Sequence, residues 1–298
     1  MAQAPDILCI GSVLWDIIGR TPAPMHLGAD VPGRITRLPG GVALNIAMTL
    51  CRYGLRPALL SCLGRDGEGD ALLAACSRMG MITEHIHRSD ELPTDRYMAI
   101  EGAAGLIAAL ADAHSLEAAG DKILRPLLDG RLGTAAAPWA GLIALDGNLT
   151  ETLLASIAVS PLFSAADLRV APASPGKAER LTPLLAHPRA TLYLNLEEAG
   201  ILCRASFDGA ASAAQCLLDR GAARVLVTDG ARPTACGAQG LGVMTAIPPP
   251  VLVTRITGAG DTFMAAHIVA ERRGAARGGA LDEALRVAAD YISGGNGS

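Results

Sequence analysis

The chain has 298 residues, and its 25 lysine and arginine residues against 29 aspartate and glutamate residues give a formal net charge of −4. With 50% hydrophobic residues it can bury a sizeable core, which excludes a disordered chain. The charge balance provides no strong basic field, which argues against a dedicated nucleic-acid-binding protein. Seven cysteines without a C-x-x-C pair argue against a disulfide framework or a zinc ribbon and favour a reducing, cytoplasmic location.

Apolar runs and amphipathic stretches alternate from the start of the chain. Residues 7–11 and 57–62 predict buried strands, and residues 41–53 and 68–79 have the periodicity of helices. This β-α-β-α order is typical of a parallel sheet with crossover helices. The order breaks at residues 97–111, where two strand-like runs flank Gly102 and Gly105 and predict a hairpin.

The alternation then resumes and continues to the end of the chain. We expect strands at 142–145, 168–171, 191–194 and 224–228, helices at 150–159, 177–185, 197–202, 210–220, after Gly260 and at 281–291, and a hairpin at 237–246. The uncharged stretch 234–254 has the length of a membrane span, but glycines and three prolines break it, so no membrane segment is predicted. Residues 1–298 therefore predict a single α/β domain, an αβα sandwich with a doubly wound, mostly parallel sheet. A small β lid is expected from about residues 13–38 and 94–112.

A loop of small residues, Gly258-Ala259-Gly260, precedes Asp261 and a long helix. Small residues let the backbone approach an anion closely, and the helix start adds N–H groups and the positive end of its dipole. Asp261 would stand where a carboxylate can accept the proton of an alcohol that attacks a phosphoryl group. The same pattern also fits an ordinary acidic residue in the first turn of a helix.

A second glycine loop, Gly40-Gly41, opens the first long helix, and Asn45 follows one turn later. Paired glycines allow a ligand to come close, and the Asn45 amide can hydrogen-bond a hydroxyl; a capped helix start is the alternative. Asp16 follows the first strand, at the end where α/β sheets bind ligands. Its carboxylate suits two sugar hydroxyls, although a solvated loop aspartate is equally common.

Polar residues follow two later strands as well. Asn195 and Glu198 begin a helix directly after a strand, so that an amide and a carboxylate share one helix face. This spacing suits a hydrated Mg²⁺ ion with its phosphates, and it equally suits a capping box. Thr228 and Gly230 end the next strand and can contact a nucleotide phosphate.

In their order along residues 7–291, these motifs resemble the signatures of the ribokinase (PfkB) family of carbohydrate kinases. The resemblance implies a ribokinase-like αβα sandwich with a β lid, and MgATP-dependent phosphorylation of a sugar or nucleoside hydroxyl. It also implies the role of each motif by position. Asp261 would be the base and Gly258, Ala259 and Gly260 the anion hole; Asp16, Gly40, Gly41 and Asn45 would hold the substrate; Asn195, Thr228 and Gly230 would bind ATP, and Glu198 the metal.

Three positions depart from the family pattern. Arg255 stands where the family often has an Asp or Asn that helps to bind a monovalent cation, which puts activation by K⁺ in doubt. His267 stands where an apolar residue is usual. The short glycine-rich stretch 294–298 leaves the adenine contacts undefined.

The lid residues bear on the substrate. Residues 93–97, the small-residue run that ends in Asp112, and residues 146–149 look most like the pseudouridine kinase branch of the family. A carboxylate at Asp112 can accept an N–H of a uracil ring that is attached through carbon, or it can face solvent at the end of a strand. The resemblance thus implies phosphorylation of pseudouridine at its 5′-hydroxyl.

Two alternatives stay open. A ribokinase- or fructokinase-like sugar kinase carries the same motifs, and a non-catalytic sugar-sensing module can keep the fold without needing Asp261 as a base. A dehydrogenase would need G-x-G-x-x-G after the first strand, and residues 11–16 lack it. The lid hairpin has small residues at 103–105, 108 and 109 and is too thin for a core of its own, so we expect it to close over substrate or to pair in a homodimer.

Overall fold

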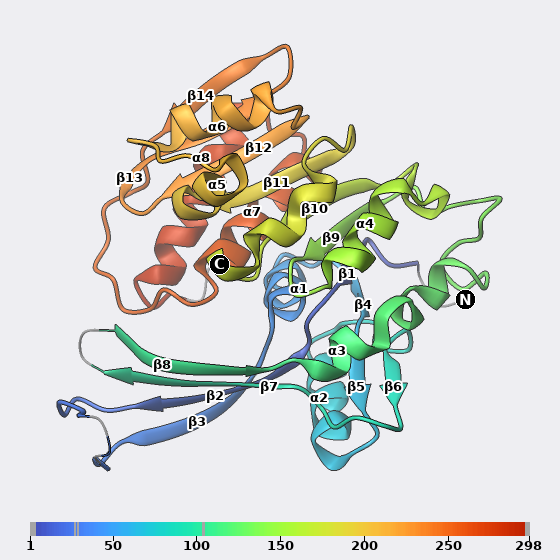
Figure 1. Ribbon diagram of the computed structural model, residues 1–298, viewed down its shortest axis with the longest axis vertical. Helices are drawn as coiled ribbons and strands as arrows, with labels where there is room; N and C mark the ends of the chain where they lie inside the picture. Colours follow the sequence, from blue (N-terminus) through green and yellow to red (C-terminus); the bar gives the residue numbers. More distant parts are fainter. Residues whose placement is uncertain (1–3, 27, 29, 103–104, 296–298) are drawn as a thin grey trace.

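The computed structural model describes residues 4–26, 28, 30–102 and 105–295. Residues 103 and 104 of the predicted lid hairpin and residues 296–298 of the glycine-rich end lie outside the described part. Figure 1 shows a large sheet with helices on both faces and a smaller sheet that extends from one side of it. No helix within the described residues is both long and apolar enough to cross a membrane.

The large sheet has eight strands. All neighbouring pairs from β4 to β12 are parallel, and β13 and β14 complete the sheet as antiparallel strands. The order across the sheet is β14 (Gly242–Ala246), β13 (Arg232–Ala238), β12 (Arg224–Asp229), β11 (Ala190–Asn195), β10 (Asp167–Ala171), β9 (Leu142–Asp146), β1 (Ile7–Ile10) and β4 (Pro57–Leu60). The predicted α/β sandwich is what the structure shows.

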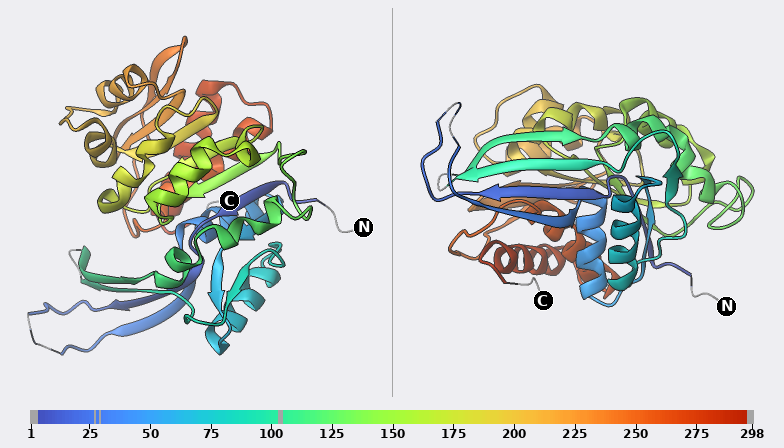
Figure 2. Two further views of the ribbon diagram at one scale, coloured as in Figure 1. Left: turned by 45° about the vertical axis from the view of Figure 1, so that its right-hand side comes forward. Right: turned by 90° about the horizontal axis from the view of Figure 1, so that it is seen from below.

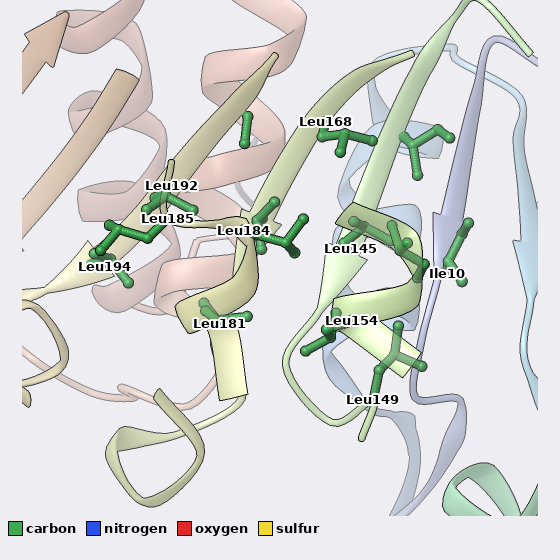
Figure 3. Packing of buried hydrophobic residues seen from close by; sticks show 14 of the residues in the cluster. Ile10, Leu145, Leu149, Leu154, Leu168, Leu181, Leu184, Leu185, Leu192 and Leu194 are labelled. Carbon is green, nitrogen blue, oxygen red and sulfur yellow. The ribbon is translucent and has the colours of Figure 1, made fainter. Parts of the chain in front are cut away.

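The sheet is buried on both faces because its central strands are largely apolar. In β1, Leu8 and Ile10 point into one layer and Ile7 and Cys9 into the other. Figure 3 shows how leucines of the strands and helices interlock in the first layer. That layer holds α4 (Glu151–Val159), α5 (Leu196–Cys203), α6 (Ala210–Asp219) and the 3₁₀ helix η3 (Pro175–Leu184); the other holds α1 (Val42–Arg52), α7 (Ala259–Arg272) and α8 (Arg277–Ile292).

The order of the strands reverses between β1 and β9. The chain passes from β1 to β4 on one side and later enters β9 on the other, so these neighbours form a topological switch point. Open α/β sheets bind ligands at such a point, outside the carboxyl ends of the strands. The residues that follow β1 and end β9 therefore border the place where a ligand is expected.

The small sheet has the order β3 (Arg34–Gly40), β2 (Leu14–Arg20), β7 (Arg96–Gly102) and β8 (Gly105–Asp112). Its strands fall in the two segments from which we expect a lid, although β3 runs on to Gly40. The left view of Figure 2 shows it standing clear of the large sheet, and every residue of β8 is exposed. Its closing over a substrate stays a prediction.

The sequence describes some connections less well than the strands. Residues 177–185 predict a regular helix, but η3 is a 3₁₀ helix from Pro175 because Pro183 has no N–H to donate within the last turn. The predicted strand 57–62 divides into β4 and β5 (Cys62–Gly64), which pairs with β6 (His87–Ser89). The remaining helices are α2 (Gly67–Arg78), α3 (His114–Ala119), η1 (Gly120–Leu127) and η2 (Pro161–Phe163).

Candidate active site

Two helices from distant parts of the chain meet at Asn45 and Asp261. Asn45 lies one turn into α1, and Asp261 lies in the first turn of α7. The Asn45 Nδ2 donates a hydrogen bond of 2.9 Å to Asp261 Oδ2 across a separation of 216 residues. The structure thus joins a predicted substrate ligand directly to the predicted base.

The start of α7 is built on a glycine turn. Gly258 has a φ of 85°, in the left-handed region that side chains with a Cβ avoid. A Cβ at this position would also stand 2.7 Å from the hydroxyl oxygen of Tyr291, so glycine is required for two reasons. The first N–H groups of any helix lack intrahelical partners and attract anions. Asp261 is the third residue of α7, directly after the exposed Gly260.

The paired glycines before α1 serve the polar residues around them. Asp16 is the third residue of β2 in the small sheet, and a Cβ on Gly40 would lie 2.0 Å from its carboxyl oxygen. Gly41 has a φ of 100°, and a Cβ there would lie 2.6 Å from the backbone oxygen of Ser12. Only glycines at both positions let the small sheet bring Asp16 against the start of α1.

The carboxyl groups of the site hold their protons tightly. Burial raises the pKa of Asp261 to about 7; the hydrogen bond from Asn45 opposes this, and the negative charges of Asp146, Asp16 and Glu198 add to it. Burial likewise raises the pKa of Asp16 to about 6 and that of Glu198 to about 7. Carboxyl groups with these raised pKa values can accept a proton near neutral pH, and their combined negative charge attracts cations.

Asp146 belongs to the stretch 146–149 that resembles the pseudouridine kinase branch, but the sequence alone assigns it no role at the site. Its fully buried carboxylate ends β9 and accepts hydrogen bonds from the backbone N–H groups of Ser12 and Asn148, both at 2.7 Å. The Ser12 hydroxyl donates to the same carboxylate and accepts from the N–H of Val42 at 2.8 Å. Asp146 thus ties the switch point to the start of α1. A charged residue that ends an otherwise apolar strand was the available signal.

Lys177 extends this network. Its Nζ donates to Asn148 Oδ1 over 2.6 Å, and Asn148 in turn donates to Ser12 and Asp146. Burial lowers the pKa of Lys177. The lysine therefore belongs to the polar wall beside the switch point and is not an isolated surface residue.

A second region lies at the ends of β11 and β12. Asn195 and Thr228 are neighbours in the parallel register of these strands. With Gly230 and the outer face of α5 they line a cleft of about 900 Å³. The structure thus brings together the three residues assigned to ATP by resemblance, in a space of a size suited to a small ligand.

Glu198 forms a complete capping box with Asn195. The Asn195 side chain accepts from the Glu198 N–H at 2.8 Å, and the Glu198 carboxylate accepts from the Asn195 N–H at 2.8 Å. Within the described residues, no group of three His, Cys, Asp or Glu side chains could hold a metal by itself. A metal ion here would therefore need ligands from phosphates and water.

Asp112 lies apart from these residues, at the end of β8. Its half-exposed carboxylate is 2.7 Å from Nδ1 of His114, and it raises the pKa of that imidazole through the hydrogen bond and its charge. In the small sheet Asp112 is opposite Arg96, which is opposite Trp15. The backbones of Asp112 and Trp15 are thus two strand spacings apart, about 10 Å.

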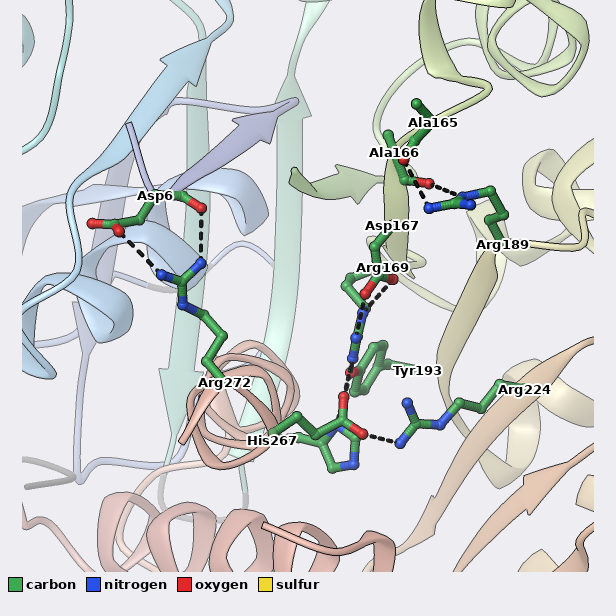
Figure 4. A network of polar contacts seen from close by, with 11 residues as sticks. Asp6, Ala165, Ala166, Asp167, Arg169, Arg189, Tyr193, Arg224, His267 and Arg272 are labelled. Carbon is green, nitrogen blue, oxygen red and sulfur yellow. Dashed lines mark hydrogen bonds and ion pairs between the residues drawn. The ribbon is translucent and has the colours of Figure 1, made fainter. Parts of the chain in front are cut away.

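The far end of α7 is fixed to the large sheet by a charged network, drawn in Figure 4. Glu271 bonds both Arg169 of β10 and Arg224 of β12, and Arg169 also donates to Asp167. His267, the departure noted above, is fully buried, with Nδ1 at 2.9 Å from the Tyr193 hydroxyl, and burial lowers its pKa to about 3. The helix that carries Asp261 is thus held at both ends.

A carboxylate with a pKa near 7, placed at a helix start that attracts anions, is the arrangement expected of proteins that transfer phosphoryl groups to small alcohols. Residues 4–291 match the model of the pfkB family carbohydrate kinases, and the chain belongs to that family. The family that the motifs resemble is therefore confirmed.

Curated relatives match over parts of their length. The chain is 32% identical over 84 residues to the pseudouridine kinase of Escherichia coli, which is 28% of this chain and 27% of that protein. It is 29% identical over 152 residues to the guanosine-inosine kinase of Exiguobacterium acetylicum, which is 50% of this chain and 47% of that protein. These matches cover about a quarter and about half of the relatives' own length.

Among solved structures, the ribokinase of Thermotoga maritima superimposes with a TM-score of 0.77 at 20% identity, covering 97% of this chain and 93% of that one. At this identity the likeness concerns the fold alone. It confirms the predicted ribokinase-like fold, a mostly parallel central sheet with a small separate sheet.

Proposed function

We propose that the protein is an ATP-dependent kinase that phosphorylates the 5′-hydroxyl of a nucleoside, with pseudouridine as the first candidate. The observation that supports a kinase most directly is the contact between Asn45 and Asp261 at the switch point, beside the start of α7. The contact supports the proposal because one alcohol could reach both the Asn45 amide and the Asp261 carboxylate.

In the proposed reaction Asp261 takes the proton of the acceptor hydroxyl as its oxygen attacks the γ-phosphorus of ATP. The new O–P bond forms while the bond from that phosphorus to ADP breaks, and the proton stays on Asp261. A pKa near 7 suits this role, because about half of the carboxyl groups are ionised at neutral pH and each still binds a proton well. N–H groups at 258–260 would hold the transferred group.

The site fits the cofactors of such a reaction. The cleft along Asn195, Thr228 and Gly230 has room for a nucleotide, and the capped, buried Glu198 carboxylate has a raised pKa that a nearby cation would lower. Mg²⁺ usually binds through one or two carboxylates together with substrate phosphates and water, so Glu198 alone is sufficient on the protein side. When bound, the ion would neutralise charge on the phosphates.

Support for a nucleoside comes from two sides. Asp16 and Asn45 stand at the switch point, where they can hold ribose hydroxyls while the 5′-hydroxyl faces Asp261. The relatives are named as kinases of pseudouridine and of guanosine and inosine, which are nucleosides. In this pose the base points towards the small sheet, and Asp112 would accept the extra ring N–H that pseudouridine has and uridine lacks.

One observation favours the alternative, a ribokinase- or fructokinase-like sugar kinase. Asp112 is half exposed and already bonded to His114, so its carboxylate has a hydrogen-bond partner even when no nucleobase is bound. A free sugar would need only Asp16, Asn45 and Asp261.

A panel of acceptors distinguishes a nucleoside kinase from a sugar kinase. With ATP and Mg²⁺, phosphorylation of pseudouridine, uridine, guanosine, inosine, adenosine, ribose and fructose is measured, and we expect the highest kcat/KM for pseudouridine. A site that hydrogen-bonds a polar edge discriminates strongly against analogues that lack it, so Asp112→Ala should narrow the gap between pseudouridine and uridine. Equal rates on the two nucleosides, or a preference for a free sugar, would reject pseudouridine and leave the kinase proposal intact. A cytoplasmic location stays a prediction.

A further inference from the structure

Arg255 lies in the segment between β14 and α7, three residues before Gly258. We call residues 258–260 the anion-binding loop, after their proposed role. Its Nε donates to the backbone oxygen of Tyr291 over 2.7 Å, and its Nη2 donates to the backbone oxygen of Gly295. The guanidinium carbon is 3.7 Å from the centre of the Tyr291 ring, within the range of a cation–π contact. One side chain thus satisfies two carbonyls and one ring face at the end of α8.

The carbonyl oxygens at this place form a cluster. The last carbonyls of a helix lack intrahelical partners and carry the negative end of its dipole. The Ile292 oxygen accepts from both the backbone N–H and the hydroxyl of Thr254 at 2.9 Å, and the neighbouring oxygens accept from Arg255. A cluster of this kind favours a cation, and the guanidinium provides a fixed one with donors in the right plane.

Tyr291 carries this contact on to the anion-binding loop. Its hydroxyl donates to the backbone oxygen of Thr257 over 2.8 Å, and it occupies the space that a Cβ on Gly258 would take. Thr257 and Gly258 set the direction in which the first N–H groups of α7 point. We call the pair Arg255 and Tyr291 the clamp.

This arrangement does not fit a bound monovalent cation. The family resemblance points to such an ion near position 255, where a carboxylate or amide would help to hold it. Here the position carries a positive charge, and that charge already occupies the carbonyls of Tyr291 and Gly295. A K⁺ ion in the same place would face a guanidinium group and would lack these oxygens.

We propose that Arg255 is a positioning residue, a built-in cation that holds the anion-binding loop through Tyr291 and makes the reaction independent of K⁺ and Na⁺. The inference rests on the proposed kinase activity, but not on which acceptor the kinase uses.

The first test uses the full-length wild-type protein with the best acceptor of the panel above. Turnover is compared in buffers whose monovalent cation is K⁺, Na⁺ or tetramethylammonium at equal ionic strength. We expect the same kcat in all three. A wild-type protein that needs K⁺ or Na⁺ for turnover would overturn the proposal.

The second test removes the cation. Arg255→Ala should lower kcat by about 10²-fold, because a small displacement of groups around the reacting atoms has an effect of this size, while the KM of the acceptor stays unchanged. Added K⁺ should restore part of the loss, since the substitution leaves carbonyl oxygens for it, and tetramethylammonium should not. The matched control is Arg273→Ala, whose guanidinium lies 5.3 Å over the Tyr53 ring at the other end of α7. It should keep the wild-type kcat.

Tyr291→Phe covers the case in which Arg255→Ala does not fold. It keeps the ring under Arg255 and removes only the hydroxyl that bonds Thr257, so kcat should fall while the acceptor KM stays. Wild-type kcat in both variants would overturn the proposal.

If no acceptor is phosphorylated, the proposed function fails and the clamp is tested by thermal unfolding instead. KCl, compared with tetramethylammonium chloride, should then raise the Tm of Arg255→Ala and leave that of the wild type unchanged. A K⁺-specific rise in the wild-type Tm would contradict the clamp.

Discussion

Asp261 differs from an ordinary aspartate in that burial and three neighbouring carboxylates favour its protonated form. Its pKa of about 7 means that the group is a poor base at pH 5.5 and a competent one at pH 8. We therefore expect kcat/KM to rise with pH, with a midpoint near 7, and then to level off. Asn45→Ala removes the hydrogen bond that favours the carboxylate and should move this midpoint to higher pH. A pH–rate profile that is flat between pH 5.5 and 8 in the wild type would contradict the assignment.

Removal of the carboxylate gives a second prediction at this scale. Asp261→Asn keeps the shape of the side chain but cannot accept the proton, and loss of a general base typically costs roughly 10²–10⁴-fold in rate. Steady-state kinetics should show this loss in kcat, while ATP binding measured by calorimetry persists. Asp282→Asn, an exposed position on α8, is the control and should behave as wild type. More than half of the wild-type turnover in Asp261→Asn would exclude it as the base.

The sequence indicates some of these residues and not others, for a physical reason. Gly258, Gly40 and Asn45 can be recognised in the sequence because a tight turn or a helix start restricts which residues fit. Arg255 is recognised in the sequence only as a departure from the family pattern, and Asp146 is given no role. Both act through partners far along the chain, Tyr291 and Ser12, which no local pattern reveals. For Asp112 the sequence predicts the position, at the end of strand β8, but not the role, which depends on a ligand.

At the scale of elements, α7 depends on its charged anchor. Burial opposes ionisation of Glu271, but the hydrogen bond from Arg224 and the charge of Arg169 outweigh it and lower its pKa to about 2. A lowered carboxyl pKa stabilises the fold above the unfolded value near 4.3, and this contribution is lost as the pH falls towards 2.

Glu271→Gln should therefore lower the free energy of unfolding at pH 7 by about 3 kcal/mol, because it removes the carboxylate that pairs with Arg224 and one of the two carboxylates that pair with the buried Arg169. Urea unfolding at pH 7 and pH 3 measures the difference, which should shrink at the lower pH. Glu283→Gln is the control, since its exposed pair with Arg286 should contribute at most about 1 kcal/mol. Equal stabilities of the two variants at pH 7 would show that the anchor does not hold α7.

The strands were predictable because a strand that is buried on both faces is an apolar run in the sequence, and glycine or polar residues mark its two ends. The 3₁₀ form of η3 was not, since the apolar spacing of residues 177–185 is that of an α-helix although Pro183 cannot donate a backbone hydrogen bond. We expected no element in residues 113–141, where the structure has the short helices α3 and η1.

At the scale of the whole molecule, the small sheet leaves large apolar side chains uncovered. Those with exposed side chains are Ile35, Leu38, Met98, Leu106, Ile107 and Leu110. A four-stranded sheet with this surface and no helix of its own is expected to pair with a second copy, so we predict a homodimer through the small sheet.

Leu110→Asp puts a charge opposite Met98 on this surface and should shift the protein to monomers in light scattering at micromolar concentration. Leu241→Asp, an equally exposed position in the turn between β13 and β14, is the control and should leave the assembly unchanged. A wild-type protein that is monomeric with and without substrate would reject the dimer.

The contact between Asn45 and Asp261 joins two residues that are 216 positions apart in the chain. During synthesis on the ribosome, α1 and the small sheet are complete at Asp112, so for about half of its elongation a nascent chain has the proposed substrate ligands without the proposed base. A prematurely terminated chain that ends before α7 would have the same defect permanently. Such a product would also lack α7 and α8, which cover one face of the large sheet, and would leave the apolar residues of that face exposed.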